Sequence, residues 1–301
     1  MIARIEALDY RCLRYIKQQL LPFHVLVGPN ASGKSAFLDV LAFMSDLVFL
    51  GPFEAVTKRA PDLSDLLWMR QGNQFELAVE LEVPQARIHQ LKNEGYNRAR
   101  YEISIGLNQD KNEIGILAET FWLISGNDPS VVSPQRDLFP DPPRPPSAIV
   151  HRAGSKAPRG WKKVVNKVAE SGNDYFSSET SGWNNLFRLG PQKPALANLP
   201  EDQTKFPIAT WFKELLMVGI QTLALHSEKM RSPSPPGAPK FFLPDGSNLP
   251  WVIDLLAKKH PRQFETWKAH IRTALPDLKQ IDTIERTEDR HRYLVLELEN
   301  G

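Results

Sequence analysis

The alternation of hydrophobic and polar residues predicts strands near the start of the chain, followed by one long helix. Residues 2–9 alternate loosely and predict a strand, and the apolar run at 23–27 is typical of a buried strand. A helix is expected over 33–50, with apolar residues on almost every side, so it should lie between other elements. The glycine and proline at 51 and 52 should end it.

A β-meander is expected after this helix. The segments 75–83, 101–107 and 114–124 are rich in alternating apolar positions, as antiparallel strands with one buried face are. In the first segment glutamates stand between the apolar residues, so its other face should be acidic and exposed to solvent. These glutamates are Glu76, Glu80 and Glu82.

The second half of the chain is less regular. Six prolines between 133 and 147 predict a stiff, extended connection. Residues 148–190 show weak periodicity, with one possible hairpin around Ile149 and Val164. The remaining pattern predicts helices at 207–217, 248–260 and 262–275, and strands at 219–225, 278–286 and 291–299.

Composition indicates a folded protein without a global attraction to polyanions. Of 301 residues, 42% are hydrophobic and 24% charged, and the net charge is +2, so nucleic-acid binding would need a local patch. Cys12 is the single cysteine and cannot form an intramolecular disulfide, which fits a reducing compartment. We find no signal peptide and no membrane-spanning stretch, so we expect a cytoplasmic protein without a membrane partner.

One motif carries specific chemistry. Residues 28–35 read GPNASGKS, which fits the phosphate-binding pattern G-x-x-x-x-G-K-[ST], and they lie between an apolar run and a helix. Backbone N–H groups of such a loop cradle the β-phosphate. Lys34 should bridge the β- and γ-phosphates as the catalytic cation, and the Ser35 hydroxyl should bind Mg²⁺, so ATP and Mg²⁺ are the expected cofactors. The candidate binding residues are Gly28, Asn30, Ala31, Ser32, Gly33, Lys34, Ser35 and Ala36.

The surroundings of this motif resemble a known group of proteins. Tyr10-Arg11 followed by FHVLVGPNASGKSAFLDVLAFM is similar to the amino-terminal part of ABC-type ATPase heads of the RecF, Rad50, SMC and OLD-like group. Ala31, where most members have glycine, resembles the AAA_21-like ATPases of the AAA family. Residues 230–249 resemble the "R-x-P … D-G-x-N-L" stretch of these proteins, whereas 52–205 is similar only in its β-rich character.

The resemblance implies an α/β fold, a P-loop NTPase ABC-type head lobe. It would have a mixed sheet, an antiparallel β subdomain and a helical or irregular insertion. We expect an ATP-binding lobe over 1–124, a proline-rich basic insertion over 125–205, and a return to the ATPase core over 206–301. The resemblance also places Arg11 near the phosphates or the adenine and Asn30 near the γ-phosphate or a partner subunit. A surface arginine on an edge strand is the alternative for Arg11.

The same resemblance implies a function. Such heads bind ATP between two subunits, so that ATP closes a homodimer and hydrolysis releases it. Members of the group serve DNA repair, chromosome maintenance or phage defence, often with a nuclease or another effector as partner. We favour an accessory or defence ATPase, because the sequence lacks the heptads of a coiled coil.

The sequence also lacks part of the expected ATPase machinery. We find no strand of four apolar residues ending in Asp-Glu, which would hold Mg²⁺ and orient the attacking water. The sequence ends in Asn300-Gly301, a strong hairpin signal, so we expect it to be the amino-terminal portion of a longer protein. This portion by itself should bind nucleotide weakly and not hydrolyse it. The missing segment and a dimer partner should be needed for hydrolysis.

Three further interpretations remain open from the residues. One is a non-catalytic module in which ATP organises a surface for a partner nuclease, and another, less favoured, is a P-loop phosphotransferase. The third is a nucleic-acid contact, because a run of basic residues around one tryptophan could follow a phosphate backbone and stack a base. An ordinary solvated loop is the alternative for this run. Its residues are Arg152, Lys156, Arg159, Trp161, Lys162 and Lys163.

Overall fold

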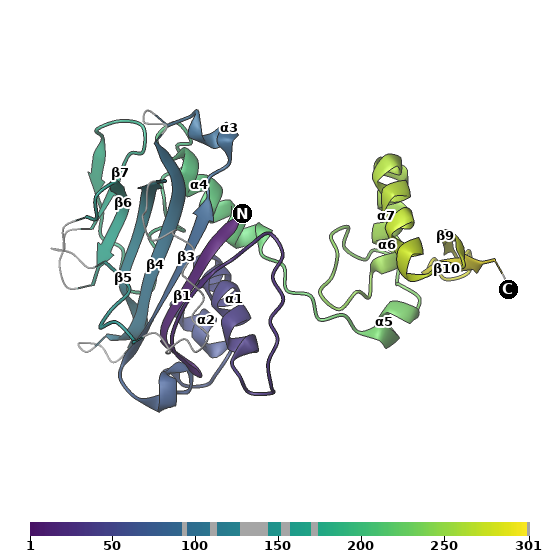
Figure 1. The fold of residues 1–301 in the computed structure, drawn as a ribbon, viewed down its shortest axis with the longest axis horizontal. Coiled ribbons are helices and arrows are strands. Elements are labelled where there is room, and N and C mark those ends of the chain that lie inside the picture. The colour runs from purple at the N-terminus through teal and green to yellow at the C-terminus, as the bar shows by residue number, and fades with distance from the viewer. Residues whose placement is uncertain (92–94, 109–112, 127–143, 152–156, 170–173, 300–301) are drawn as a thin grey trace, which may run out of the picture. The chain divides into compact units, whose positions relative to one another are not determined.

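The computed structural model describes two compact units within the chain, Met1–Ile220 and Gln221–Gly301 (Figure 1). The described residues are 1–91, 95–108, 113–126, 144–151, 157–169 and 174–299. Most of the proline-rich connection, the basic residues Arg152 and Lys156, and the Asn-Gly signal lie outside them. None of the helices described is long and apolar enough to cross a membrane.

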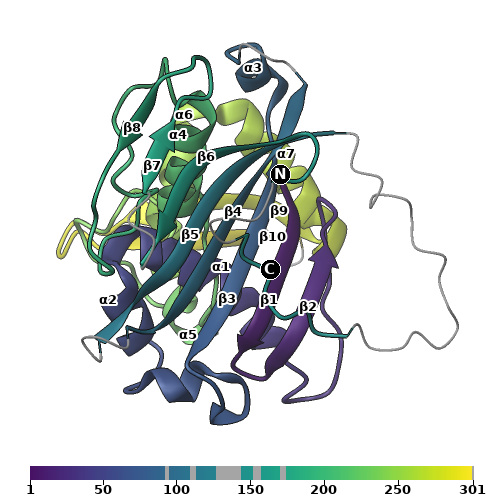
Figure 2. The same ribbon diagram turned by 90° about the vertical axis from the view of Figure 1, so that its left-hand side faces the viewer.

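The first unit is built on one sheet of eight antiparallel strands in the order β2-β1-β3-β4-β5-β6-β7-β8 (Figure 2). The meander predicted over 75–124 is confirmed as the centre of this sheet. The strands are β1 (Ile2–Tyr10), β2 (Leu13–Gln19), β3 (Gln74–Glu82), β4 (Tyr96–Asn108), β5 (Glu113–Ser125), β6 (Trp161–Val168), β7 (Tyr175–Ser177) and β8 (Asn184–Leu186).

Helices cover one face of this sheet, behind the strands in Figure 2. The predicted long helix is confirmed as α1, which ends where Gly51, at φ 98°, donates its N–H to the Leu47 carbonyl at 2.9 Å. The helices are α1 (Lys34–Leu50), α2 (Pro52–Thr57), η1 (Leu63–Leu66), η2 (Trp68–Arg70), α3 (Gln85–Ile88), α4 (Pro207–Glu214) and its π-helical continuation η4 (Leu215–Gly219).

Part of the core lies between α1 and the strands β1 and β3. The rings of Tyr10, Phe43 and Phe75 meet at centroid distances of 4.9 to 5.8 Å, and all three side chains are buried. Aromatic groups packed at these distances stabilise a core beyond the area that they bury. This cluster fixes the helix that follows the phosphate-binding motif against the sheet.

The opposite face of the sheet is polar but buried, which corrects the prediction for β3. Glu76 and Glu80 are 1% and 2% exposed, whereas Glu82 is exposed as expected. Residues 149–151 supply main-chain N–H groups to this face, and Arg100 lies across it. The alternating pattern identified the face correctly, but it could not show that a distant segment covers that face.

Arg100 is the centre of this buried polar face. Its guanidinium contacts three carboxylates, those of Glu6 at 2.9 Å, Glu80 at 2.9 Å and Glu102 at 2.5 Å. Glu102 also accepts hydrogen bonds from the backbone and ring of His151. Burial by itself would raise the pKa of Glu102. The combined effect of Arg100 and His151 outweighs burial and lowers this pKa to about 2. The network therefore ties three strands, β1, β3 and β4, and segment 144–151 together through charge.

Buried glutamates also attach connecting segments by their main chains. Three carboxylates each accept hydrogen bonds from two consecutive backbone N–H groups, at 2.6 to 3.0 Å. Because buried N–H groups must be satisfied, these bonds serve segments that no described strand pairs with and, at Glu179, the first turn of α4. The pairs are Glu76 with Ile149 and Val150, Glu119 with Ala195 and Leu196, and Glu179 with Ile208 and Ala209.

Three other predictions are wrong. Segment 23–27 is not a strand, and Phe23, Val25 and Val27 are 81%, 63% and 89% exposed. An apolar run becomes a strand only where neighbouring strands satisfy its main chain, and no strand pairs with this one in the described part. Residues 219–225 likewise form no strand. Val164 belongs to β6, which pairs with β5 and β7 and forms no hairpin with Ile149.

The second unit contains the two helices and the two-stranded antiparallel sheet predicted for 248–299, and one further short helix at Ser227–Arg231. Arg292 joins them, because its guanidinium contacts Asp254 and Glu285 at 2.7 Å and covers the Trp251 ring at 4.4 Å. The elements of this unit are α5 (Ser227–Arg231), α6 (Leu249–Lys259), α7 (Pro261–Ala274), β9 (Leu278–Glu285) and β10 (Arg292–Leu298).

Candidate functional site: a phosphate-binding loop

The phosphate-binding motif forms a tight loop that leads directly into α1. Ala31 and Gly33 both have left-handed backbones, at φ 63° and 92°, and Ser32 donates its N–H to the Pro29 carbonyl at 3.3 Å. The first helical hydrogen bond runs from Phe37 N–H to the Gly33 carbonyl at 2.8 Å. The loop thus turns sharply and brings the positive end of α1 to its mouth.

The two glycines of the motif lie close to neighbouring side chains, and Gly33 is the more constrained of the two. A Cβ atom on Gly33 would lie 3.1 Å from Leu13 Cδ2, on a backbone that already disfavours side chains. A Cβ atom on Gly28 would lie 2.9 Å from Ser32 Oγ. These positions keep the loop narrow, so its main chain can approach an anion closely.

Lys34 lies over its own loop. Its Nζ atom donates hydrogen bonds to the carbonyls of Gly28 and Pro29 at 2.8 and 2.7 Å. These carbonyls are weak partners for an ammonium group compared with charged phosphate oxygens. Lys34 is therefore already held beside the loop on which we expect the phosphates to bind.

The loop borders a cavity of about 490 Å³. This cavity brings together the predicted Arg11 and seven of the eight predicted loop residues, while Gly28 contributes through its bond to Lys34. Cys12 and Asp65 also border it, and no sequence motif pointed to either. The lining residues are Arg11, Cys12, Asn30, Ala31, Ser32, Gly33, Lys34, Ser35, Ala36 and Asp65.

Arg11 reaches the cavity from the turn between β1 and β2. Its backbone is left-handed, at φ 54°, and its N–H bonds to the Leu66 carbonyl at 2.8 Å. Its Nη1 atom contacts Asp39 Oδ2 on α1 at 2.9 Å. The arrangement places one guanidinium and one ammonium group at the same cavity, a combination suited to a polyphosphate.

The described part of the basic run lies away from this loop, at β6. Lys163 covers the Trp122 ring at 4.7 Å, and Lys162 donates to the Glu179 carbonyl at 3.0 Å. Burial lowers the pKa of both lysines. Trp161 packs its ring against Trp122, and Arg159 is exposed. The two lysines and the tryptophan thus contact protein groups, and a nucleic-acid role for them stays a prediction.

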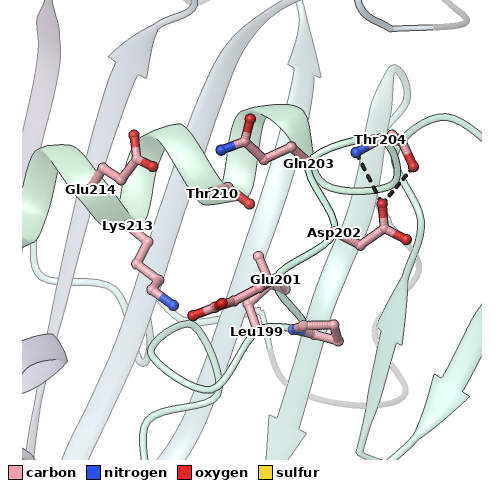
Figure 3. Close-up of a pocket in the computed structure, with 9 residues that line it drawn as sticks. Leu199, Glu201, Asp202, Gln203, Thr204, Thr210, Lys213 and Glu214 are labelled. Atoms are coloured by element: carbon pink, nitrogen blue, oxygen red, sulfur yellow. Dashed lines mark hydrogen bonds between the residues drawn. The ribbon is translucent and has the colours of Figure 1, made fainter.

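A second cavity, of about 710 Å³, lies between residues 199–204 and α4 (Figure 3). Asp202 accepts hydrogen bonds there from the backbone and hydroxyl of Thr204, at 3.0 and 2.5 Å, and Lys213 donates to the Ala197 carbonyl at 3.0 Å. Hydrogen bonds from Thr204 and Lys205 lower the pKa of Asp202 to about 2. These bonds stabilise a turn, so we assign the cavity no chemistry.

Comparison with protein families identifies the chain. Residues 23–295 match a family described as "AAA domain, putative AbiEii toxin, Type IV TA system". The chain belongs to this AAA domain family. The matched residues include the phosphate-binding loop, α1 and nearly all of the second unit. The predicted resemblance to AAA_21-like ATPases of the AAA family is therefore confirmed, and the helices packed on a sheet confirm the α/β fold class.

Solved structures and curated proteins add little to this assignment of the AAA domain. One solved structure, described as "Structural biochemistry of ATP-driven dimerization and DNA stimulated activation of SMC ATPases", is 18% identical over 40% of this chain and 68% of its own. Its TM-score is 0.29. No significant match was found among curated proteins.

Proposed function

We propose that this chain is the ATP-binding part of an ABC-type ATPase in which bound ATP brings two copies together. The cavity beside the phosphate-binding loop carries the proposal, because Lys34, Arg11 and the start of α1 all border it. The left-handed backbone of Gly33 and the close approach of Leu13 to it fit a main-chain cradle for phosphate. ATP would supply the negative charge that these groups are arranged to bind.

The proposal assigns roles to the residues at the loop. Lys34 would exchange the Gly28 and Pro29 carbonyls for phosphate oxygens, and the exposed Ser35 hydroxyl, in the first turn of α1, would bind Mg²⁺. When bound, Mg²⁺ would neutralise charge on the terminal phosphates. Asn30, exposed at the rim, would face the γ-phosphate or the second copy.

Control of a DNA-related or defence effector by this dimerisation is the further part of the proposal. The resemblance to RecF- and SMC-like heads supports it, and so does the toxin–antitoxin description of the matched family. We propose further that the chain on its own binds ATP without hydrolysing it, because its sequence contains no strand ending in Asp-Glu to orient water.

Isothermal titration of Mg²⁺-ATP into the wild-type chain and into Lys34→Ala tests the nucleotide site. We expect the substitution to weaken binding at least about tenfold, since one charge-assisted hydrogen bond is worth about 1.5–3 kcal/mol. Lys17→Ala is the matched control, because Lys17 is exposed on β2 outside the cavity lining. Equal affinities of the wild type and Lys34→Ala would overturn the site. Light scattering with ATP against ADP tests the dimer.

A further inference from the structure

Asp39 lies beside the nucleotide cavity without lining it. It follows Ser35 by one helical turn on α1, and its carboxylate accepts three hydrogen bonds. The donors are Tyr10 OH at 2.6 Å, Arg11 Nη1 at 2.9 Å and Arg59 Nε at 2.8 Å. An unpaired carboxylate one turn beyond the loop would repel phosphate. The role of Asp39 therefore depends on the groups that pair with it.

Two of these donors are fixed by their surroundings. The Arg59 side chain is 7% exposed, contacts Asp46 at 2.8 Å and covers the Phe43 ring at 5.0 Å. Tyr10 is fully buried. Asp39 therefore remains well paired on this side whatever happens at the cavity.

Arg11 differs from both. Its side chain is 34% exposed and borders the cavity, and Nη1 is its one guanidinium atom bonded within the described part of the chain. A guanidinium carries five N–H donors in a planar fork, so the remaining donors are available to a ligand. The left-handed backbone of Arg11, bonded to the Leu66 carbonyl, fixes the point from which the side chain extends.

We propose that Asp39 is a positioning residue that fixes the Arg11 guanidinium through one amino group and turns the other toward bound nucleotide. The inference rests on the proposed function, because it assumes that the cavity binds ATP. Arg11 contacts nucleotide directly, whereas Asp39 acts only through Arg11. Pre-ordering a flexible side chain in this way strengthens binding because the ordering cost is met before the ligand arrives.

A double-mutant cycle on the dissociation constant of Mg²⁺-ATP tests the coupling. We expect Arg11→Ala to weaken binding about tenfold or more and Asp39→Asn about fivefold. The double variant should be no weaker than Arg11→Ala alone, because Asp39 has no effect without Arg11. Asp46→Asn is the matched control, since Asp46 also pairs with Arg59 but not with Arg11.

Arg11→Lys gives a second measurement that does not depend on the folding of the Asp39 variant. Lysine keeps the charge but loses the fork that reaches two partners at once, so we expect it to bind ATP several-fold more weakly. Wild-type affinity of this variant would overturn the inference. Additive effects in the cycle, or an equal loss in Asp46→Asn, would overturn it too. If the wild-type chain does not bind ATP, or Lys34→Ala binds as well as it does, the proposed function fails first.

Discussion

Replacing Arg100 by methionine is the strongest single test of the buried polar face. The guanidinium is almost fully buried and contacts the carboxylates of Glu6, Glu80 and Glu102. Methionine fills a similar volume but leaves these carboxylates without their shared cation. Removing one partner of a buried ion pair costs about 3–5 kcal/mol. We therefore expect the free energy of unfolding at pH 7.5 to fall by at least that much.

The pH dependence of this loss separates charge from packing. In the wild type the pKa of Glu102 is about 2, below the 4.5 of an unfolded glutamate, so its stabilising contribution is present above pH 4.5 and lost below it. Without Arg100, burial and the neighbouring carboxylates of Glu6 and Glu80 disfavour the charged form, so the pKa of Glu102 should rise even though His151 still donates to it. The variant should then regain stability as the pH falls from 7.5 to 5, and the difference from the wild type should shrink.

Urea unfolding at pH 7.5 and pH 5 measures both effects. Arg98→Met is the matched control, because Arg98 is two residues earlier on β4 and only half-buried. Arg98→Met should lower the free energy of unfolding by less than about 1 kcal/mol, as substitutions outside buried networks do. A loss below about 1 kcal/mol in Arg100→Met, or the same loss at both pH values, would refute the reasoning.

Three other predictions concern single residues. Burial raises the pKa of Glu179 to about 7 from the unfolded 4.5, so its contribution to stability is lost as the pH rises from 4.5 to 7. Glu179→Gln should remove this dependence of stability on pH, which is worth on the order of 3 kcal/mol. The same change in the free energy of unfolding between pH 4.5 and pH 7 in both proteins, measured with urea, would contradict us. Gly33→Ala should abolish ATP binding, while Gly72→Ala, also at positive φ but with nothing within 4 Å, should lose only about 1–2 kcal/mol of stability. Mg²⁺-ATP should slow maleimide labelling of Cys12, which is exposed at the cavity, in the wild type but not in Lys34→Ala. An unchanged labelling rate in the wild type at saturating Mg²⁺-ATP would place the nucleotide elsewhere.

Local patterns predicted what local physics determines. Three local patterns were each sufficient to predict an element, because these elements form from neighbouring residues. They are the Gly-Pro stop after position 50, the all-round apolar pattern of α1 and the alternation in β3 to β5. The pattern of the loop also lies within eight residues, and the structure brings seven of its eight candidate residues to one cavity. That these residues bind nucleotide stays a prediction.

Contacts between distant residues could not be predicted in the same way. The glutamates of β3 looked solvated, since the N–H groups that bind Glu76 come from residues more than 70 positions later. Asp39 could be placed one turn after Ser35 by helical spacing, but its bond to Arg59 depends on how α2 packs. The apolar run at 23–27 has the length and composition of a buried strand. In the described part of the chain, however, no strand lies beside it to pair with its main chain.

That run has a practical consequence for work with the isolated chain. Among the described residues it shows no main-chain hydrogen bonds within 21–27, and Phe23, Val25 and Val27 are exposed, whereas Leu26 is half-buried. An extended apolar segment with unpaired peptide groups is a template for intermolecular strand pairing. We expect the chain to self-associate with rising concentration even without nucleotide. A Val25→Lys variant should suppress this association and leave any dimer that depends on ATP.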